Sequence, residues 1–571
     1  MQPRRLLTLS LLLLSSACTA ARAAEVAPAL SPWLADGPRP VWVFFADKGA
    51  MEDSPAARED AANRLSARAL ARRARLGRSA DVVGWADLPN DPAYLDWLTA
   101  HGFSVRAESR WLAAVTVVTD GAGVRLLATA PFVARLAPVG GAGRPEPDRL
   151  PAPSAPGANR ALPLDYGGSL PELEQVNLPP LHDLGFHGEG VVVGMLDSGF
   201  NTTHEALSGL SVLGAYDFVN DDPVVANEPG DPDGQENHGT ETFSTLAGHA
   251  PGSLIGPAFG ASFYLAKTED VSQEVPAEED FWVEGIEWLE ANGCDLVSSS
   301  LAYDDWYTFE DYDGNTCVTT IAADMAVALG VAVFNSAGNY RQTTGTIAAP
   351  ADGDSVITVG AVEITGEIAG FSSPGPTADG RIKPDVCALG VSNNVVVPGT
   401  LDQYQGASGT SFSCPLTAGV GAVLLGAHPG TSPVLLREAL RRTASQSTTP
   451  DNDYGWGIVN ALAAYEWLGA TAAPAAAPAG PLHLAGNWPN PFNPSTRIAF
   501  SLDHPLDARL DVLDLQGRHL RRLHAGRLDA GAHALSWDGR DDGGHPVASG
   551  VYVLRLAGEG HQQRLKVMLL K

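Results

Sequence analysis

Short apolar runs separated by amphipathic stretches dominate the middle of the chain. The first run is 190–196 (GVVVGML), and similar runs of buried-strand type recur at 262–267, 295–300, 330–335 and 355–362. Helical patterns lie between several of them, for example at 279–292 and 320–329. Buried strands that alternate with helices form parallel sheets covered on both faces. The pattern therefore predicts an α/β domain over residues 181–468, with reacting groups at the carboxyl ends of its strands.

Different patterns flank this domain. Residues 25–150 mix strand-like runs such as 41–46 (VWVFFA) with helical ones such as 55–76, which predicts a compact α+β unit. A connector rich in Pro and Gly follows at 151–180, and we expect it to be exposed. After an Ala/Pro linker at 469–481, residues 482–571 alternate in short runs between Gly- and Asp-rich turns, which predicts a small β-sandwich.

The first 24 residues have the pattern of a secretory signal peptide. Arg4 and Arg5 precede a short apolar run at 6–17, and Ala21-Arg22-Ala23 has the small residues of a cleavage site. Lipid attachment at Cys18 is the alternative. We therefore expect the mature chain to be secreted or held on the outer cell surface.

Charge narrows the range of partners. The 571 residues include 37 Lys and Arg against 66 Asp and Glu, a net charge of −29, and most of the excess acid lies between 151 and 480. Such a surface repels nucleic acid and anionic membranes. It would tolerate calcium or attract cationic substrates, although a solvated surface is the simpler interpretation.

Cysteines are few and leave the disulfides open. Four lie beyond the leader, and no two have metal-site spacing. In an exported chain they could form up to two disulfides by any of three pairings. They are Cys294, Cys317, Cys387 and Cys414.

Four residues in the α/β domain could carry chemistry, although each is a weak signal alone. Asp197 ends the first apolar run in Asp-Ser-Gly, which is also a common turn. His238 opens His-Gly-Thr-Glu-Thr ahead of a helix predicted at 242–248, and Asn339 ends a loop after a buried strand. Ser411 lies in GASGTSFSCPL (406–416), a tight turn that opens an apolar helix. A helix N-terminus favours developing negative charge, although Ser411 could equally be an N-cap.

Together these residues resemble a known family. The order Asp, His, Ser across one parallel α/β domain is that of subtilisin-type enzymes. The surrounding words match as well: VVVGMLDSG around Asp197, ENHGTE around His238, VAVFNSAGN ending at Asn339 and GTSFSCP around Ser411. Residues 181–468 resemble the subtilisin-like serine proteases, or subtilases.

The resemblance implies a role for each residue. His238 would take the proton of Ser411, Asp197 would orient the imidazole, and Asn339 with the Ser411 N–H would bind the oxyanion. No cofactor would be required.

Ser300-Leu301-Ala302 resembles the strand that pairs with extended substrate and walls the P1 pocket. An ordinary core strand is the alternative for this segment. The family usually has Gly where Ala302 stands and Pro where Leu389 stands. The acidic stretch 217–236 could bind structural calcium, as in many subtilases, although a solvated loop is the favoured interpretation.

The flanking units fit the same resemblance. Residues 25–150 resemble a subtilase propeptide, which acts as folding chaperone and temporary inhibitor. The words NWPNPFNPST (487–496) and ASGVYVLRL (548–556) resemble the sorting or hook-capping-type modules of exported bacterial proteins. Such a tail would engage export machinery.

The sequence thus predicts a monomeric, secreted serine endopeptidase made as a self-processed zymogen, acting on proteins or peptides. Two alternatives remain: a non-catalytic surface or adhesion protein on a subtilase scaffold, and a processing protease dedicated to one partner.

Overall fold

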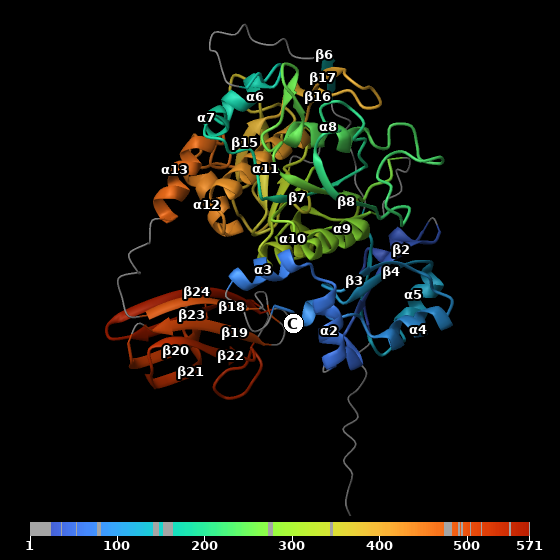
Figure 1. The fold of residues 1–571 in the computed structure, drawn as a ribbon. Helices are drawn as coiled ribbons and strands as arrows, with labels where there is room; N and C mark the ends of the chain where they lie inside the picture. The colour runs from blue at the N-terminus through green and yellow to red at the C-terminus, as the bar shows by residue number, and fades with distance from the viewer. Residues whose placement is uncertain are drawn as a thin grey trace, which may run out of the picture. The chain divides into compact units, whose positions relative to one another are not determined.

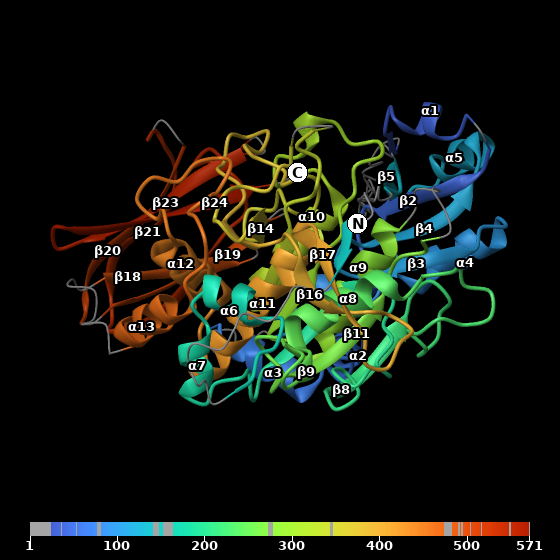
Figure 2. The same ribbon diagram turned by 90° about the horizontal axis from the view of Figure 1, so that it is seen from above.

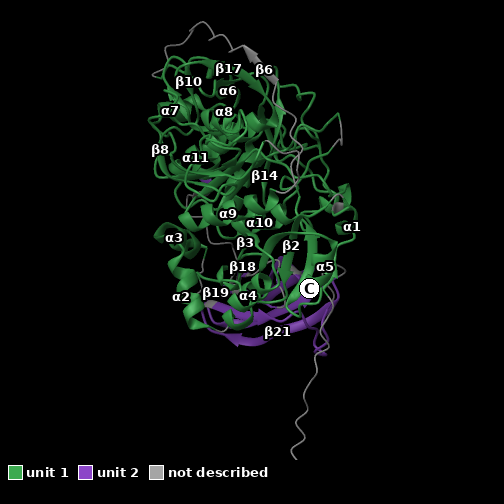
Figure 3. Cartoon of the chain, turned by 90° about the vertical axis from the view of Figure 1, so that its right-hand side faces the viewer, with its two compact units in different colours: residues 1–469 green, residues 470–571 purple. Residues whose placement is uncertain are grey.

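A computed structural model describes residues 24–569 except 36, 53, 77–81, 141–147, 152–163, 272–277, 343–345, 473–481, 489–491, 493–494, 503, 515–516 and 548–549. The chain divides into two compact units, Met1–Gly469 and Ala470–Lys571 (Figure 3). The expected signal peptide, apart from its last residue, lies outside the described residues, as does most of the expected Ala/Pro linker.

A parallel sheet forms the centre of the first unit (Figure 1). Among the described residues it has seven strands in the order β15-β14-β13-β12-β7-β11-β8, all parallel. The strands are β7 (Val192–Asp197), β8 (Ser211–Asp217), β11 (Ser262–Lys267), β12 (Leu296–Ser299), β13 (Ala332–Ser336), β14 (Ile357–Val362) and β15 (Val386–Leu389). All five predicted runs form strands, and the α/β prediction is confirmed.

Helices cover both faces of this sheet (Figures 1 and 2). Val193 and Met195 of β7 pack with α8 (Asn237–Ala247) and α11 (Thr410–Ala427). The alternate residues Val192 and Leu196 pack with α9 (Glu279–Asn292) and α10 (Val318–Ala328). Helix α11 is long and apolar enough to cross a membrane, but 89% of it is buried in the unit, so it is a core helix. Two further helices, α12 (Pro433–Thr443) and α13 (Ala461–Ala472), follow α11.

The end of the expected connector is not exposed. Residues 170–183 form two short helices, α6 (Leu170–Gln175) and α7 (Pro179–Asp183). Leu173 and Leu181 are fully buried in the core that α8 and α11 share. Prolines of this segment lie at the first positions of both helices. Proline is tolerated there because the N–H that it lacks would have no partner within the helix.

Two small antiparallel sheets complete this part of the unit. One joins β9 (His249–Ala250) to β10 (Leu254–Ile255). The other has the order β16-β17-β6, from Asn393–Val396, Tyr404–Ser408 and Asp148–Pro151. Strand β17 leads directly into α11.

Residues 24–140 form the predicted α+β domain around a sheet of the order β1-β5-β2-β4-β3. Its strands are Glu25–Val26, Arg39–Phe45, Val105–Ser109, Ala114–Thr119 and Val133–Pro138 for β1 to β5. Its helices are α1 (Leu30–Trp33), α2 (Pro55–Asn63), α3 (Ala67–Arg75), α4 (Pro92–Ala100) and α5 (Gly121–Leu127). The single helix predicted at 55–76 is wrong: it is split into α2 and α3 because the Ser66 side chain caps α3 by accepting the Ala69 N–H.

This domain packs against α9 and α10. Its Trp42 and Trp111 belong to the same apolar cluster as Trp282 and Ile286 of α9. The two domains of the first unit therefore share a core.

The second unit consists of two antiparallel sheets, β18-β19-β22 and β21-β20-β23-β24. In order, β18 to β24 are Leu482–Trp488, Thr496–Leu502, Leu506–Leu513, His519–Leu528, Gly531–Trp537, Gly550–Gly558 and His561–Leu569. Residues of both sheets, among them Phe500 and Leu554, form one core around Trp537. Two sheets over one core are the predicted sandwich.

The four cysteines beyond the leader are buried free thiols. None of the three disulfide pairings that the sequence left open is formed.

Candidate active site

An acid and an imidazole meet at the carboxyl edge of the parallel sheet. Asp197 is the last residue of β7, and His238 is the second residue of α8, which begins earlier than predicted. His238 Nδ1 lies 2.6 Å from Asp197 Oδ1. The Thr242 hydroxyl donates to Asp197 Oδ2 at 3.1 Å and the Ser198 N–H to Oδ1 at 2.7 Å. The buried carboxylate is thus held in place, and Nε2 is the nitrogen left for chemistry.

A glycine allows α8 to approach the end of β7. A Cβ added to Gly239 would lie 2.1 Å from the Gly199 carbonyl oxygen and 3.0 Å from Asp197 Cβ. Any larger residue would push the helix away from the strand. The glycine after His238 therefore makes the contact between imidazole and carboxylate sterically allowed.

Ser411 is the second residue of α11 and is 8% exposed. Gly409, the N-cap, has φ +153, a conformation that L side chains rarely adopt. Pro415 is the sixth residue of the helix. Because proline has no N–H, the Ser411 carbonyl lacks its helical donor, and the Ser300 hydroxyl donates to it instead at 3.0 Å. Ser300 thus braces the turn that carries Ser411.

The imidazole lies beside the start of α11. Its ring centroid is 6.4 Å from that of Phe412, the residue after Ser411. Within the described residues no hydrogen bond joins His238 to the Ser411 hydroxyl. Proton transfer between them requires a closer approach than the structure shows, which is common before substrate binds.

Asn339 follows β13 and is aimed at the same turn. Its Oδ1 accepts from the N–H and from the hydroxyl of Thr410, both at 3.0 Å, so its amide donor points elsewhere. A Cβ added to Gly409 would lie 3.4 Å from Asn339 Nδ2 and 3.6 Å from Ser411 N. The Asn339 amide nitrogen and the Ser411 backbone nitrogen therefore lie near one point at Gly409.

The other predicted residues lie next to this group. Leu301 is buried, and its carbonyl accepts from Asn335 Nδ2 at 3.0 Å. Ala302 is partly buried against a small cluster that contains Tyr307 and Tyr312. Of these three residues, Ser300 is the one whose side chain is hydrogen-bonded to the Ser411 turn in the described structure.

Sequence reasoning missed three supporting residues: Thr242, Ser198 and Thr410. Two stand within four residues of a predicted site residue, and Thr410 precedes Ser411. Their hydroxyls and amides supply the hydrogen bonds that orient Asp197 and Asn339. The signal was their spacing, since i+4 on a helix places Thr242 on the face of His238.

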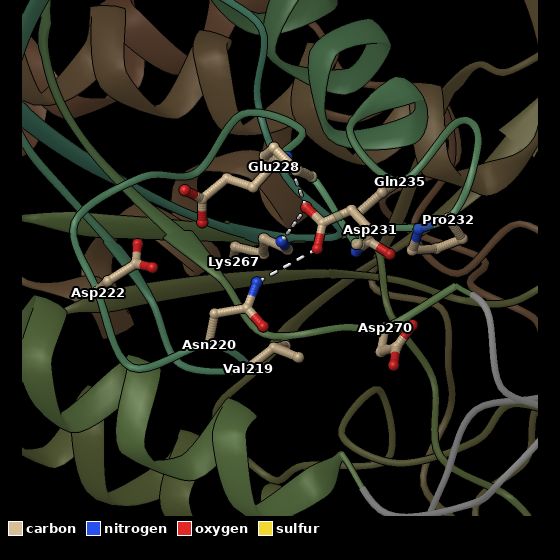
Figure 4. A pocket seen from close by; sticks show the side chains of 11 residues that line it. Val219, Asn220, Asp222, Glu228, Asp231, Pro232, Gln235, Lys267 and Asp270 are labelled. Carbon is tan, nitrogen blue, oxygen red and sulfur yellow. Dashed lines mark hydrogen bonds and ion pairs between the residues drawn. The ribbon is translucent and has the colours of Figure 1, made fainter.

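The acidic stretch 217–236 encloses a cavity of about 500 Å³ (Figure 4). Side-chain oxygens of Asp217, Asp222 and Glu228 lie within 4.8 Å of one another. Lys267 Nζ lies 2.7 Å from Asp217 and 2.9 Å from Asp231, so it already neutralises part of this charge. Desolvation and the neighbouring Asp222 raise the pKa of Glu228. Carboxylates without enough compensating charge are suitable ligands for a hard cation.

The site combines an imidazole held by a carboxylate with a serine at a helix N-terminus, and both lie at the carboxyl edge of a parallel sheet. This arrangement is typical of serine hydrolases with an α/β fold. Sequence comparison is consistent with this class. The subtilase family model matches residues 188–457, and a Bacteroidota peptidase S8 propeptide domain matches 40–146. A FlgD Ig-like domain matches 488–561.

Curated relatives agree with these matches. Subtilisin E of Bacillus subtilis is 32% identical over 304 residues, which cover 52% of this chain and 72% of the relative. Subtilisin of Bacillus pumilus is 32% identical over 295 residues, covering 51% and 97%. Serine protease AprX of Bacillus subtilis is 31% identical over 302 residues, covering 48% and 66%. The chain belongs to the subtilase family and is a subtilisin-like serine endopeptidase with an N-terminal propeptide domain.

Proposed function

We propose that the chain is the precursor of a secreted protease in which Ser411 attacks the peptide carbonyl. His238 Nε2 takes the serine proton and then gives it to the leaving amine. Asp197 holds Nδ1–H and stabilises the imidazolium that forms. Asn339 Nδ2 and the Ser411 N–H stabilise the oxyanion. The observation that carries this proposal is the 2.6 Å contact between His238 and Asp197, next to the helix that bears Ser411.

Self-processing fits the path of the chain. Strand β6 follows the propeptide domain and pairs antiparallel with β17, which ends at Ser408, three residues before Ser411. The chain that leaves the propeptide therefore passes beside the proposed nucleophile. Ser300, Leu301 and Ala302 would pair with the extended substrate on the other side.

Replacing the nucleophile tests the proposal. Purified Ser411→Ala should remain in its precursor form, digest no casein and take up no fluorophosphonate probe, because the attacking oxygen is gone. Ser413→Ala is the matched control, since its buried hydroxyl only donates to the Thr410 carbonyl. No probe labelling of the wild type would favour a non-catalytic protein on the subtilase scaffold, and equal labelling of wild type and Ser411→Ala would show that the reactive residue is not Ser411.

A calcium ion at the acidic loop is part of the proposal. Asp222 and Glu228 would supply ligands, with Asp217 shared between the ion and Lys267. Calcium in excess should raise Tm and a chelator should lower it, whereas Glu228→Gln should remove most of the difference. An identical Tm with and without the ion would reject the site.

Localisation and partners complete the proposal. The family, its propeptide and the FlgD-like domain fit a protease outside the cell or on its surface. The C-terminal domain would engage export machinery, and the net charge of −29 argues against nucleic acid as a partner. We propose that the mature enzyme acts as a monomer on protein or peptide substrates.

A further inference from the structure

Helix α3 of the propeptide domain docks at the edge of the sheet opposite the candidate active site (Figure 1). Asp197 ends β7, whereas the contacts of α3 fall on Gly190 and Asp295, which precede β7 and β12. Strand β7 has six residues, so the two edges are about 20 Å apart. The α3 contact is therefore separate from anything that enters the active site.

The Arg72 guanidinium donates hydrogen bonds to backbone carbonyls at the C-terminal ends of α9 and α10. Its Nη1 donates to the Cys294 carbonyl at 2.5 Å, Nη2 to the Glu290 carbonyl at 3.0 Å and Nε to the Leu329 carbonyl at 3.2 Å. Nη2 also pairs with the Glu290 carboxylate, and both side chains are nearly fully buried. Carbonyls at a helix C-terminus lack intrahelical donors and carry partial negative charge. A planar group with several fixed donors satisfies them as an ammonium cannot.

Two further arginines complete the contact. Arg68 donates to the Gly293 carbonyl at 3.1 Å and the Gly190 carbonyl at 2.6 Å, and pairs with Asp295. Arg73 binds Glu290 with Nε at 2.8 Å and Nη2 at 2.5 Å, and is itself held by Asp87 of the propeptide domain. Within the part of the chain that the structure describes, both cationic partners of the buried Glu290 carboxylate thus come from the propeptide.

The acceptor groups form a site on the protease side that we call the exosite. It consists of the carboxylates of Glu290 and Asp295 and the carbonyl oxygens of Gly190, Glu290, Gly293, Cys294 and Leu329.

We propose that the exosite is a further binding site for the propeptide, besides the apolar contact of Trp42 and Trp111 with α9, that it is specific for guanidinium groups on a helix, and that it retains the propeptide after cleavage. This inference rests on the proposed function, in which the propeptide is cut from the protease and inhibits it. Two attachments on one body bind more tightly than either alone, because release of one leaves the other in place. Loss of α3 should therefore act on the dissociation rate.

The maturing full-length chain provides the test. Arg72→Ala should be cleaved as fast as wild type, but the cut propeptide should dissociate on the order of thirtyfold faster, since truncating one partner of a buried pair acts on dissociation. The lag between cleavage on a gel and peptidase activity should shorten accordingly, and the propeptide should leave the protease on size exclusion. Arg75→Ala, exposed on the same helix, is the matched control. A lag equal to that of the control would overturn the exosite.

A second measurement does not depend on catalysis. In uncut Ser411→Ala chain, Glu290→Gln keeps the shape of the exosite but removes its charge. Amide exchange of α3 should then accelerate, whereas α5 of the same domain should be unchanged. This variant also serves if Arg72→Ala fails to fold. Unchanged amide exchange in α3 would reject the exosite. If exchange in α3 becomes faster but the wild-type chain shows no proteolysis, the exosite stands and only the proposed function is rejected.

Discussion

At the scale of single residues, the site depends on side chains that hold other side chains. Asp197 is fixed by Thr242 and Ser198 before it orients His238, and Thr410 fixes Asn339 in the same way. Ser300 supplies the donor that Pro415 cannot. Asp197, Asn339 and the turn that carries Ser411 are therefore held in place by neighbouring side chains, whereas the contact between His238 and Ser411 still has to close.

Asn339→Ala tests this at the residue scale. Because only the transition state carries the oxyanion charge, kcat should fall by roughly 10² to 10³ with KM little changed, the magnitude measured for an oxyanion asparagine of a subtilisin. Steady-state kinetics on a peptide amide measure both. Thr410→Val, which removes one of the two donors to Asn339 Oδ1, should have a smaller effect. A rise in KM at constant kcat would assign Asn339 to ground-state binding instead.

At the scale of elements, α9 has two functions. One side of it covers the parallel sheet, and its acidic side chains face the propeptide domain. Arg106 Nη1 donates to Asp280 at 2.7 Å, the Glu108 N–H to Glu284 at 2.8 Å and the Ser109 hydroxyl to Glu287 at 2.5 Å. Asp280 and Glu287 are buried and Glu284 is half-buried, and because each accepts a hydrogen bond from the propeptide domain the interface is sensitive to protons.

Propeptide binding should weaken as pH rises. Burial raises the pKa of Glu284 to about 8. The hydrogen bond from the Glu108 N–H lowers this pKa, whereas the nearby carboxylates of Asp280, Glu287 and Glu108 raise it further. Burial likewise raises the pKa of Glu279 to about 7. In the free protease the pKa of Glu284 should fall towards the ordinary 4.5, because the propeptide residue Glu108 no longer lies against it. The complex of protease and propeptide then binds protons more tightly than the separated protease does. The affinity of the protease for the propeptide is therefore greatest below pH 4.5 and is lost progressively up to about pH 8.

Dissociation of the cut propeptide, followed at pH 5 and pH 8.5, measures this dependence. Glu284→Gln should flatten it, because an amide has no proton to lose. Tighter binding at the higher pH would contradict the assignment.

At the scale of the whole molecule, the chain consists of two units with separate cores. The second unit packs around Trp537 with residues of its own two sheets. The propeptide domain, by contrast, shares the core of α9 and α10 and belongs to the first unit. The propeptide domain is thus part of the folded first unit, whereas the C-terminal domain has a core of its own.

Truncation after Ala472, the last residue of α13, should therefore leave catalysis intact. We expect kcat/KM on a soluble peptide and the Tm of the first unit to match those of the full chain, because domains with their own cores fold independently. Delivery to the cell surface should be lost if the domain engages export machinery. A truncated chain that fails to mature would show instead that the C-terminal domain supports folding.

Local sequence patterns predicted five strands of the parallel sheet and the residues of the candidate site. Buried strands such as β7 and β14 are recognisable as apolar runs in the sequence. Each candidate site residue lies in a short sequence motif near the end of a strand or helix. Strands β8 and β15 gave weaker signals, since β8 begins with exposed residues and β15 has four residues. The composition of residues 55–76 predicted one continuous helix, but Ser66 caps a separate helix, α3.

Contacts between residues far apart in the sequence could be identified from the folded structure alone. Arg72 and Glu290 stand 218 residues apart, and nothing near either residue indicates that they pair. Ser300 and Ser411 are 111 residues apart, and their contact exists because β12 ends beside α11. Local patterns report the burial and backbone preference of each residue, because those act over a few neighbours. A partner for a buried charge or an orphaned carbonyl is set by packing, which brings distant segments together.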